Sequence, residues 1–249
     1  MITTQKIRMP VDISMTILSV ILMGGTVLFP NDKVHQILGM ALIFLWALHI
    51  ALNRRWYASV GRGRYNPYRI MQTVINLSIL VCTILLAVSG MMMAWFLPES
   101  VNVPLGFART AHLVSSHWYY VFMCAHLGMH AEMIANKIRL SRTQQKYHSS
   151  VQQECHSRAP TRESPDKAKA IKAIAAKVLL TLVCVYGIYA FIVRGVGKYM
   201  FLRQQFFFLD LEKGYLNFAL DYLSILALIA TASHWLGKAL RAWNSGRKE

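Results

Sequence analysis

The sequence predicts an all-α integral membrane protein with six transmembrane helices. Of its 249 residues, 55% are hydrophobic and only 15% are charged, whereas a soluble domain of this length usually carries more charge. The apolar residues also fall into blocks close to the ~20 residues that a helix needs to cross a hydrocarbon core of ~30 Å. These blocks are 11–30, 33–53, 70–96, 109–135, 176–196 and 216–237. Because backbone polar groups do not stay unpaired in lipid, we expect each block to be helical.

The basic residues indicate which ends of these helices face the cytoplasm. Most of the 27 lysines and arginines lie in the N-terminus, the 54–69 loop, segment 137–177 or the C-terminus. The six exceptions are Lys33, Arg109, Arg194, Lys198, Arg203 and Lys213. This positive-inside pattern predicts that both termini are cytoplasmic. The net charge of +16 then reflects topology and attraction to lipid head groups. Nucleic acid is not an expected partner, since the basic runs contain no recognisable binding motif.

Composition divides the chain into three parts. Residues 1–136 hold the first four apolar blocks and are expected to form a four-helix core. Residues 137–170 are rich in Ser, Gln, Lys and Arg, which predicts a basic cytoplasmic linker. Residues 171–249 hold the last two blocks and are expected to form a two-helix C-terminal membrane extension.

Two of the predicted helices carry histidines at the same spacing. The stretches HQILGMALIFLWALH (35–49) and HLVSSHWYYVFMCAH (112–126) each begin and end on histidine, fourteen residues apart. At 100° per residue, fourteen steps fall within ~40° of a whole number of turns, so each pair lies on one helix face with ~21 Å between its members. The two helices run in the same direction through the membrane, because one helix separates them.

Matching depth therefore predicts two histidine pairs, His35 with His112 near the outer surface and His49 with His126 nearer the inner surface. Each pair is placed to clamp one flat haem b, which gives two haems per chain. Imidazole on both axial positions leaves the iron no open site, which suits electron transfer. A single histidine in a membrane helix is more often a polar helix contact, but the repeated spacing at matching depth favours haem ligation.

Other residues are candidate contacts for the haem propionates or for the ligands themselves. They are Lys33, Arg109, Asn53 and Arg54. His130 follows His126 by one helical turn, so the two are alternatives for the roles of ligand and additional contact. A histidine pair at this spacing also suits Zn²⁺ or Cu, and a histidine-based metal transporter is therefore the alternative function.

Each of three further polar residues has more than one candidate role. His117 lies on a different helix face from His112 and is either a helix contact or part of a quinol pocket. Asp221 is a partner of Arg203, a proton acceptor or an interfacial polar residue. His234 is a proton-relay residue or a side chain with ordinary partners near the inner surface.

The twinned histidine spacing resembles the di-haem four-helix core of membrane cytochromes b, over about residues 10–136. The whole chain is similar to a prokaryotic family of six-helix, b-type-cytochrome-like membrane proteins in HIALNRRW (49–56), HLVSSHWYYVFMCAHLGMH (112–130) and FALDYLSILAL (218–228). This resemblance implies the prokaryotic cytoplasmic membrane and a role beside extracytosolic, flavin-carrying redox proteins. The chain differs from respiratory cytochrome b, since it lacks both the eight-helix length and the Pro-Glu-Trp-Tyr stretch of the quinol site.

The expected function is transmembrane electron transfer through two bis-histidine haems, as part of a respiratory chain. Electrons would pass between a quinol pool or a cytoplasmic-side donor and an extracytosolic redox partner. On this hypothesis the protein is an electron-transfer subunit of an oxidoreductase, and quinone is a candidate partner beside the lipid bilayer. The haem supplies the redox chemistry, and the protein supplies its position and electrostatic surroundings.

Overall fold

A computed structural model describes residues 2–29, 31–98, 104–136, 140, 165–206 and 214–246, with the side chains of 2–6 and 165–170 left out. Every regular element in these residues is a helix. The elements are α1 (Ile2–Leu22), the 3₁₀ turn η1 (Thr26–Leu28), α2 (Asp32–Leu52), α3 (Arg54–Ser59), α4 (Pro67–Met92), α5 (Leu105–Met129), α7 (Pro165–Val193), α8 (Val196–Met200) and α9 (Gly214–Ser245). Most of the predicted linker 137–170 lies outside the described residues.

Within the described residues, four helices are long and apolar enough to cross a membrane. They are α2, α4, residues Ile171–Val193 of α7, and α9. This confirms a helical protein with helices able to span a membrane, whereas a total of six crossings stays a prediction. Helices α1 and α5 have 21 and 25 residues, but charged and histidine side chains lower their hydropathy. Such helices enter a bilayer most easily when their polar side chains face other helices.

The helix ends follow from local chemistry. Asn31 caps α2 by accepting a hydrogen bond from the backbone N–H of Lys33, and Asn66 caps α4 in the same way through Arg69. Helix α1 begins and ends earlier than its predicted block, 11–30. It stops at Leu22 because Gly25 has a φ of +61°, a conformation that glycine adopts without steric cost.

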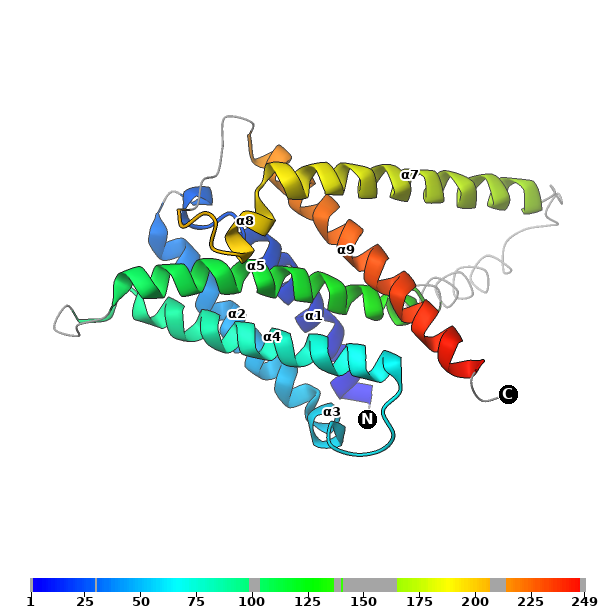
Figure 1. Cartoon of the computed structure of the whole chain (residues 1–249), viewed down its shortest axis with the longest axis horizontal. Coiled ribbons are helices and arrows are strands. Elements are labelled where there is room, and N and C mark those ends of the chain that lie inside the picture. The colour runs from blue at the N-terminus through cyan, green and yellow to red at the C-terminus, as the bar shows by residue number, and fades with distance from the viewer. Residues whose placement is uncertain are drawn as a thin grey trace, which may run out of the picture.

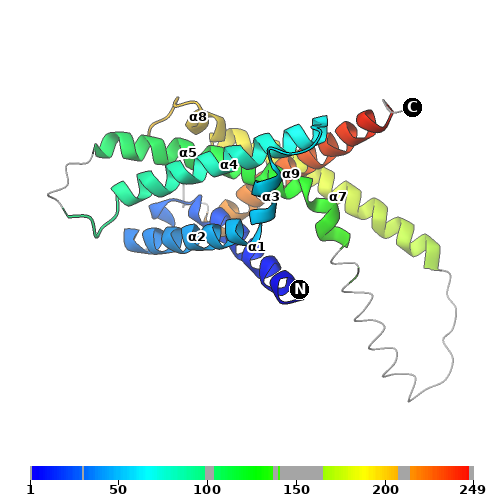
Figure 2. The same ribbon diagram turned by 90° about the horizontal axis from the view of Figure 1, so that it is seen from below.

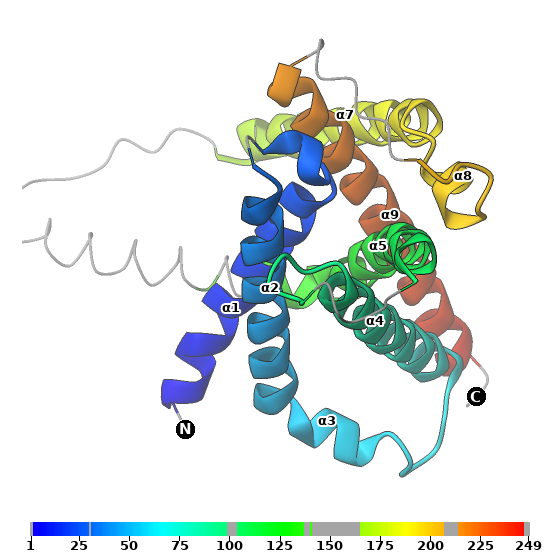
Figure 3. The same cartoon turned by 90° about the vertical axis from the view of Figure 1, so that its left-hand side faces the viewer.

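The helices are arranged as consecutive pairs: α1 with α2, α4 with α5, and α7 with α9 (Figure 1). The α1–α2 pair and the α4–α5 pair lie as two layers, which are separated in both side views (Figure 2 and Figure 3). Helix α5 has a central position, since it contacts α4, α9 and α8. Helix α2 packs mainly on α1 and only lightly on α4. The two layers therefore leave the histidine-bearing helices α2 and α5 in different pairs.

The tightest packing joins α5 to α9. The hydroxyl of Tyr120 donates a hydrogen bond to the carbonyl oxygen of Tyr222, and both side chains are fully buried. Ser233 Oγ donates to the carbonyl of Ala125 at 3.0 Å. At Gly128 an added Cβ would overlap the α9 backbone, so the two helices touch through a position without a side chain. The last helix is in this way packed directly against the fourth predicted block.

Candidate functional site

His35 and His112 come together at one end of the molecule. His35 lies in the first turn of α2 and His112 in the second turn of α5. Their ring centres are 6.3 Å apart and their planes are inclined by 68°. A metal ion bound by two imidazole nitrogens at about 2 Å each would hold the ring centres about 6 Å apart. The separation therefore fits two axial ligands of one iron as well as an edge-to-face ring contact.

The two outer histidines differ in how their Nδ1 atoms are bound. His112 Nδ1 lies 3.1 Å from the hydroxyl oxygen of Ser89 on α4. His35 Nδ1 is buried, and no group among the described residues makes a hydrogen bond with it.

Glycines leave room around the outer pair. Gly39 lies one turn after His35, and a Cβ added there would meet nothing within 4 Å. At Gly90 on α4, an added Cβ would lie 3.5 Å from Cε1 of His112. Open space on α2 and a close approach of α4 are both compatible with a flat group between the helices.

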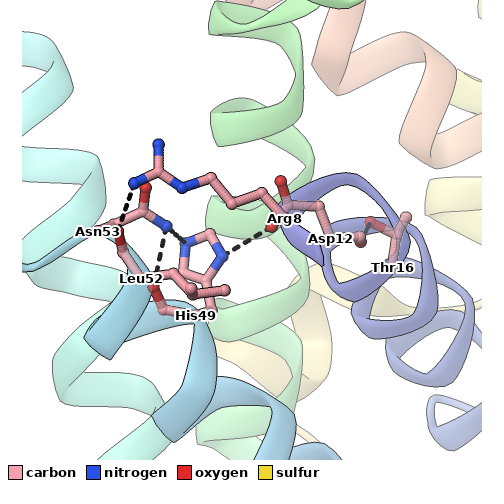
Figure 4. A network of polar contacts seen from close by, with 6 residues as sticks. All are labelled: Arg8, Asp12, Thr16, His49, Leu52 and Asn53. Carbon is pink, nitrogen blue, oxygen red and sulfur yellow. Dashed lines mark hydrogen bonds and ion pairs between the residues drawn. The ribbon is translucent and has the colours of Figure 1, made fainter. Parts of the chain in front are cut away.

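At the other end of α2, His49 is bound by a polar network (Figure 4). His49 Nδ1 lies 2.8 Å from Asp12 Oδ1 on α1. Asn53 donates from Nδ2 to the His49 carbonyl at 2.9 Å, and the same amide nitrogen lies 3.4 Å from His49 Nε2. Arg8 of α1 donates to the Leu52 carbonyl at 2.6 Å. This network attaches the end of α2 to α1.

His126 has a separate set of partners. Its Nδ1 lies 2.8 Å from Asn76 Oδ1 on α4, and its ring centre is 4.6 Å from that of His130. The structure records no ring contact between His126 and His49. It brings the outer pair together, whereas each inner histidine contacts its own neighbours, so ligation by the inner pair stays a prediction.

Three of the four histidines share one feature: Nδ1 is hydrogen-bonded to a side-chain oxygen. The partners are Asp12, Asn76 and Ser89. An N–H donated from Nδ1 to such an oxygen fixes the neutral tautomer with its lone pair on Nε2, which is the usual outer shell of a metal-bound histidine. At His49 that lone pair faces the Asn53 amide nitrogen, 3.4 Å away. Sequence reasoning missed these partners. In the sequence these partners are isolated polar residues within apolar blocks. The sequence does not show which helix faces meet, so it does not show that these residues contact the histidines.

Most of the residues predicted to contact the haem propionates are exposed or have other neighbours. Lys33 Nζ lies 4.9 Å from the centre of the Trp95 ring. Arg109 and Arg54 are exposed. Asn53 alone among these four residues contacts a predicted ligand, through its hydrogen bonds to His49.

The remaining polar candidates have defined neighbours. His117 is buried, its Nδ1 lies 2.8 Å from the Leu113 carbonyl, and its ring stacks on Tyr199 at 4.6 Å. Asp221 pairs with Arg194 at 2.7 Å, not with Arg203, because Arg194 directly follows α7, which packs on α9. Tyr186 also donates its hydroxyl to Asp221, at 2.6 Å.

His234 lies half-buried beside Trp235. Across the described ranges, no group of three or more His, Cys, Asp or Glu residues is arranged to hold a metal ion. Any metal held by described histidines alone would therefore have at most two of them as ligands.

Comparisons with protein-family models, with curated proteins and with solved structures find no match for this chain. The case for a function therefore rests on the residues and their geometry.

Proposed function

We propose that this protein transfers electrons across the membrane through two haem b groups, held by His35 with His112 and by His49 with His126. The donor is a quinol pool or a cytoplasmic-side protein, and the acceptor is an extracytosolic redox protein, for which a flavin carrier is the candidate. The observation that carries the proposal is the outer pair. Its rings lie 6.3 Å apart, which is the separation of two imidazoles on one metal.

The chain's own residues would hold and orient the ligands. Ser89 would fix the ring of His112 from α4 through its hydrogen bond with Nδ1. Asp12 and Asn76 bind Nδ1 of the inner histidines in the same manner. A haem iron with two imidazole ligands exchanges one electron between its ferric and ferrous states. The protein sets the potential of that exchange through ligand hydrogen bonding and burial.

The experiment is to purify the full chain from membranes and record its reduced-minus-oxidised absorption spectrum. We expect a b-type spectrum, and we expect the pyridine haemochrome assay to give two haems per chain. A protein that is purified folded but colourless, from cells supplied with a haem precursor, would contradict the proposal. One haem per chain would restrict it to the outer pair.

A metal-handling function is the second candidate, because His126 and His130 lie with their ring centres 4.6 Å apart. Histidines one helical turn apart are a spacing suited to Zn²⁺ or Cu, which would require the two rings to move apart. Elemental analysis of the same preparation separates the two functions. Zinc or copper without porphyrin supports metal handling, whereas iron with porphyrin supports electron transfer.

A further inference from the structure

A cavity of about 430 Å³ lies between α3 and the first turns of α4. Its lining includes Trp56 of α3, Arg62 of the connecting loop, and Arg69, Gln72 and Thr73 of α4. The cavity is at the membrane boundary, because the apolar helices α2 and α4 end and begin beside it, at Leu52 and Pro67. The positive-inside pattern places this boundary on the cytoplasmic side.

Arg69 gives the loop beside the cavity a defined shape. Its Nη2 donates to the carbonyls of Ser59 at 2.8 Å and Arg62 at 2.5 Å. Its guanidinium also lies over the Tyr65 ring, 4.6 Å from the centre. Through these contacts, loop residues 59–65 fold around the Arg69 side chain. These contacts place the Arg62 backbone beside the cavity, and the exposed Arg62 side chain is among the residues that line it.

The positive charge of the loop beside the cavity is not balanced by acidic residues of the same loop. Residues 53–69 contain five arginines and no acidic residue. In the part of the chain that the structure describes, no carboxylate forms an ion pair with any of these arginines. Such a cluster attracts anions, and at this depth the most abundant anions are the head groups of the lipid bilayer.

We propose that the cavity binds the phosphate group of an anionic phospholipid of the cytoplasmic leaflet. The exposed guanidinium of Arg62 suits this ligand, since such a group donates parallel hydrogen bonds to phosphate oxygens, whereas the Arg69 donors are used by the loop carbonyls. Arg62 and Arg69 supply the charge, and Gln72 and Thr73 supply further polar groups for the head group. Trp56 provides an apolar wall of the kind that lies at the level of lipid head groups. This proposal is independent of haem binding.

The test compares lipid binding by the full chain and two matched variants. Short-chain phosphatidylglycerol or phosphatidylcholine is titrated into the detergent-solubilised protein, and bound lipid is counted by native mass spectrometry. Arg62→Gln removes a charge that lines the cavity. Arg64→Gln removes one from the same loop, at a position outside the cavity lining. Arg62→Lys keeps the charge, and gel filtration with circular dichroism checks the fold of each variant.

We expect phosphatidylglycerol to bind more tightly than phosphatidylcholine. Arg62→Gln should weaken phosphatidylglycerol binding about fivefold, as expected for one basic residue at a membrane surface. Arg64→Gln should change it less than twofold, and Arg62→Lys should retain most of it. An equal loss in Arg62→Gln and Arg64→Gln would mean diffuse surface charge and overturn the proposal. Equally effective competition by inorganic phosphate would mean a free-anion site and overturn the lipid assignment.

Discussion

Arg194 Nε lies 2.7 Å from Asp221 Oδ2, and the two side chains are only 9% and 11% exposed. The pair joins the end of α7 to α9, and the Tyr186 hydroxyl occupies the other carboxylate oxygen. A buried ion pair contributes little net stability, but removal of one partner leaves an uncompensated buried charge. The pair therefore fixes how α7 and α9 are aligned more than it stabilises the fold.

Substitution of one partner should accordingly be far more damaging than substitution of both. We expect Asp221→Leu to destabilise the protein by about 3 kcal/mol, because Arg194 is left without its counter-ion. The double variant Arg194→Met/Asp221→Leu should recover most of that loss. Thermal unfolding in detergent measures both. If the double variant is as unstable as the single one, the ion pair itself is stabilising and this interpretation is wrong.

Gly128 is the point at which α5 and α9 approach most closely. A Cβ at this position would overlap the Ala230 carbonyl and Ser233 Oγ, so Gly128→Ala should destabilise the protein by about 1–3 kcal/mol, the usual cost of overpacking. The matched control on the same helix is Gly106→Ala, where an added Cβ meets nothing within 4 Å. Alanine should there be neutral or stabilising by up to about 1 kcal/mol. Equal effects in the two variants would argue against the close helix crossing.

Substitution of Ser89 tests the proposed outer haem site, because Ser89 contacts the proposed ligand His112 and does not itself bind the iron. Loss of the hydrogen bond between Ser89 and His112 Nδ1 should free the imidazole to rotate, so Ser89→Ala should weaken haem binding at this site about tenfold. Haem titration of the apoprotein, followed by absorbance, measures the change. Ser78→Ala on the same helix is the control and should bind haem as the unmodified protein does. A Ser89→Ala protein with unchanged affinity would remove Ser89 from the site.

The all-helical character of the chain and the proximity of His35 to His112 could be predicted from the sequence, for physical reasons. Apolar blocks of membrane length admit only helices, and His35 and His112 both lie near the start of helices that follow the same direction. The partners Ser89, Asn76 and Asp12 were not accessible, because they depend on which faces of α4 and α1 meet the histidines. The fourteen-residue spacing also assumes that α2 and α5 remain side by side.

At the inner histidines that assumption stays a prediction, because each of the two is hydrogen-bonded to a different neighbouring helix. Helix α2 packs on α1, and its C-terminal end is attached there through the hydrogen bonds of Asp12 with His49 and of Arg8 with Leu52. Helix α5 belongs to the other pair, and His126 is bound by Asn76 of α4. Spacing along each helix predicts depth in the membrane, but not the lateral separation of two helices that have different neighbours.

The predicted orientation can be tested at the two chain ends. With both termini cytoplasmic, a fluorescent protein that folds only in the cytoplasm should be active when fused to either terminus. Alkaline phosphatase, which needs export, should be inactive at both. The same phosphatase inserted between α4 and α5 should be active, since that connection is predicted on the outer side. Phosphatase activity at one terminus alone would mean an odd number of membrane crossings and would contradict the six-helix topology.

Single histidine substitutions separate the two proposed haems. His35→Ala and His49→Ala should each lower the haem content from two per chain to one, because each removes one axial ligand of a different site. The double variant should contain none. His117→Ala is the control, since His117 lies on another face of α5 and stacks on Tyr199, and it should keep both haems. Redox titration of the single variants should then show one potential each, and the two potentials should differ. If His35→Ala loses both haems while its α-helical content is unchanged, the sites are not independent and the assignment of ligands in pairs is wrong.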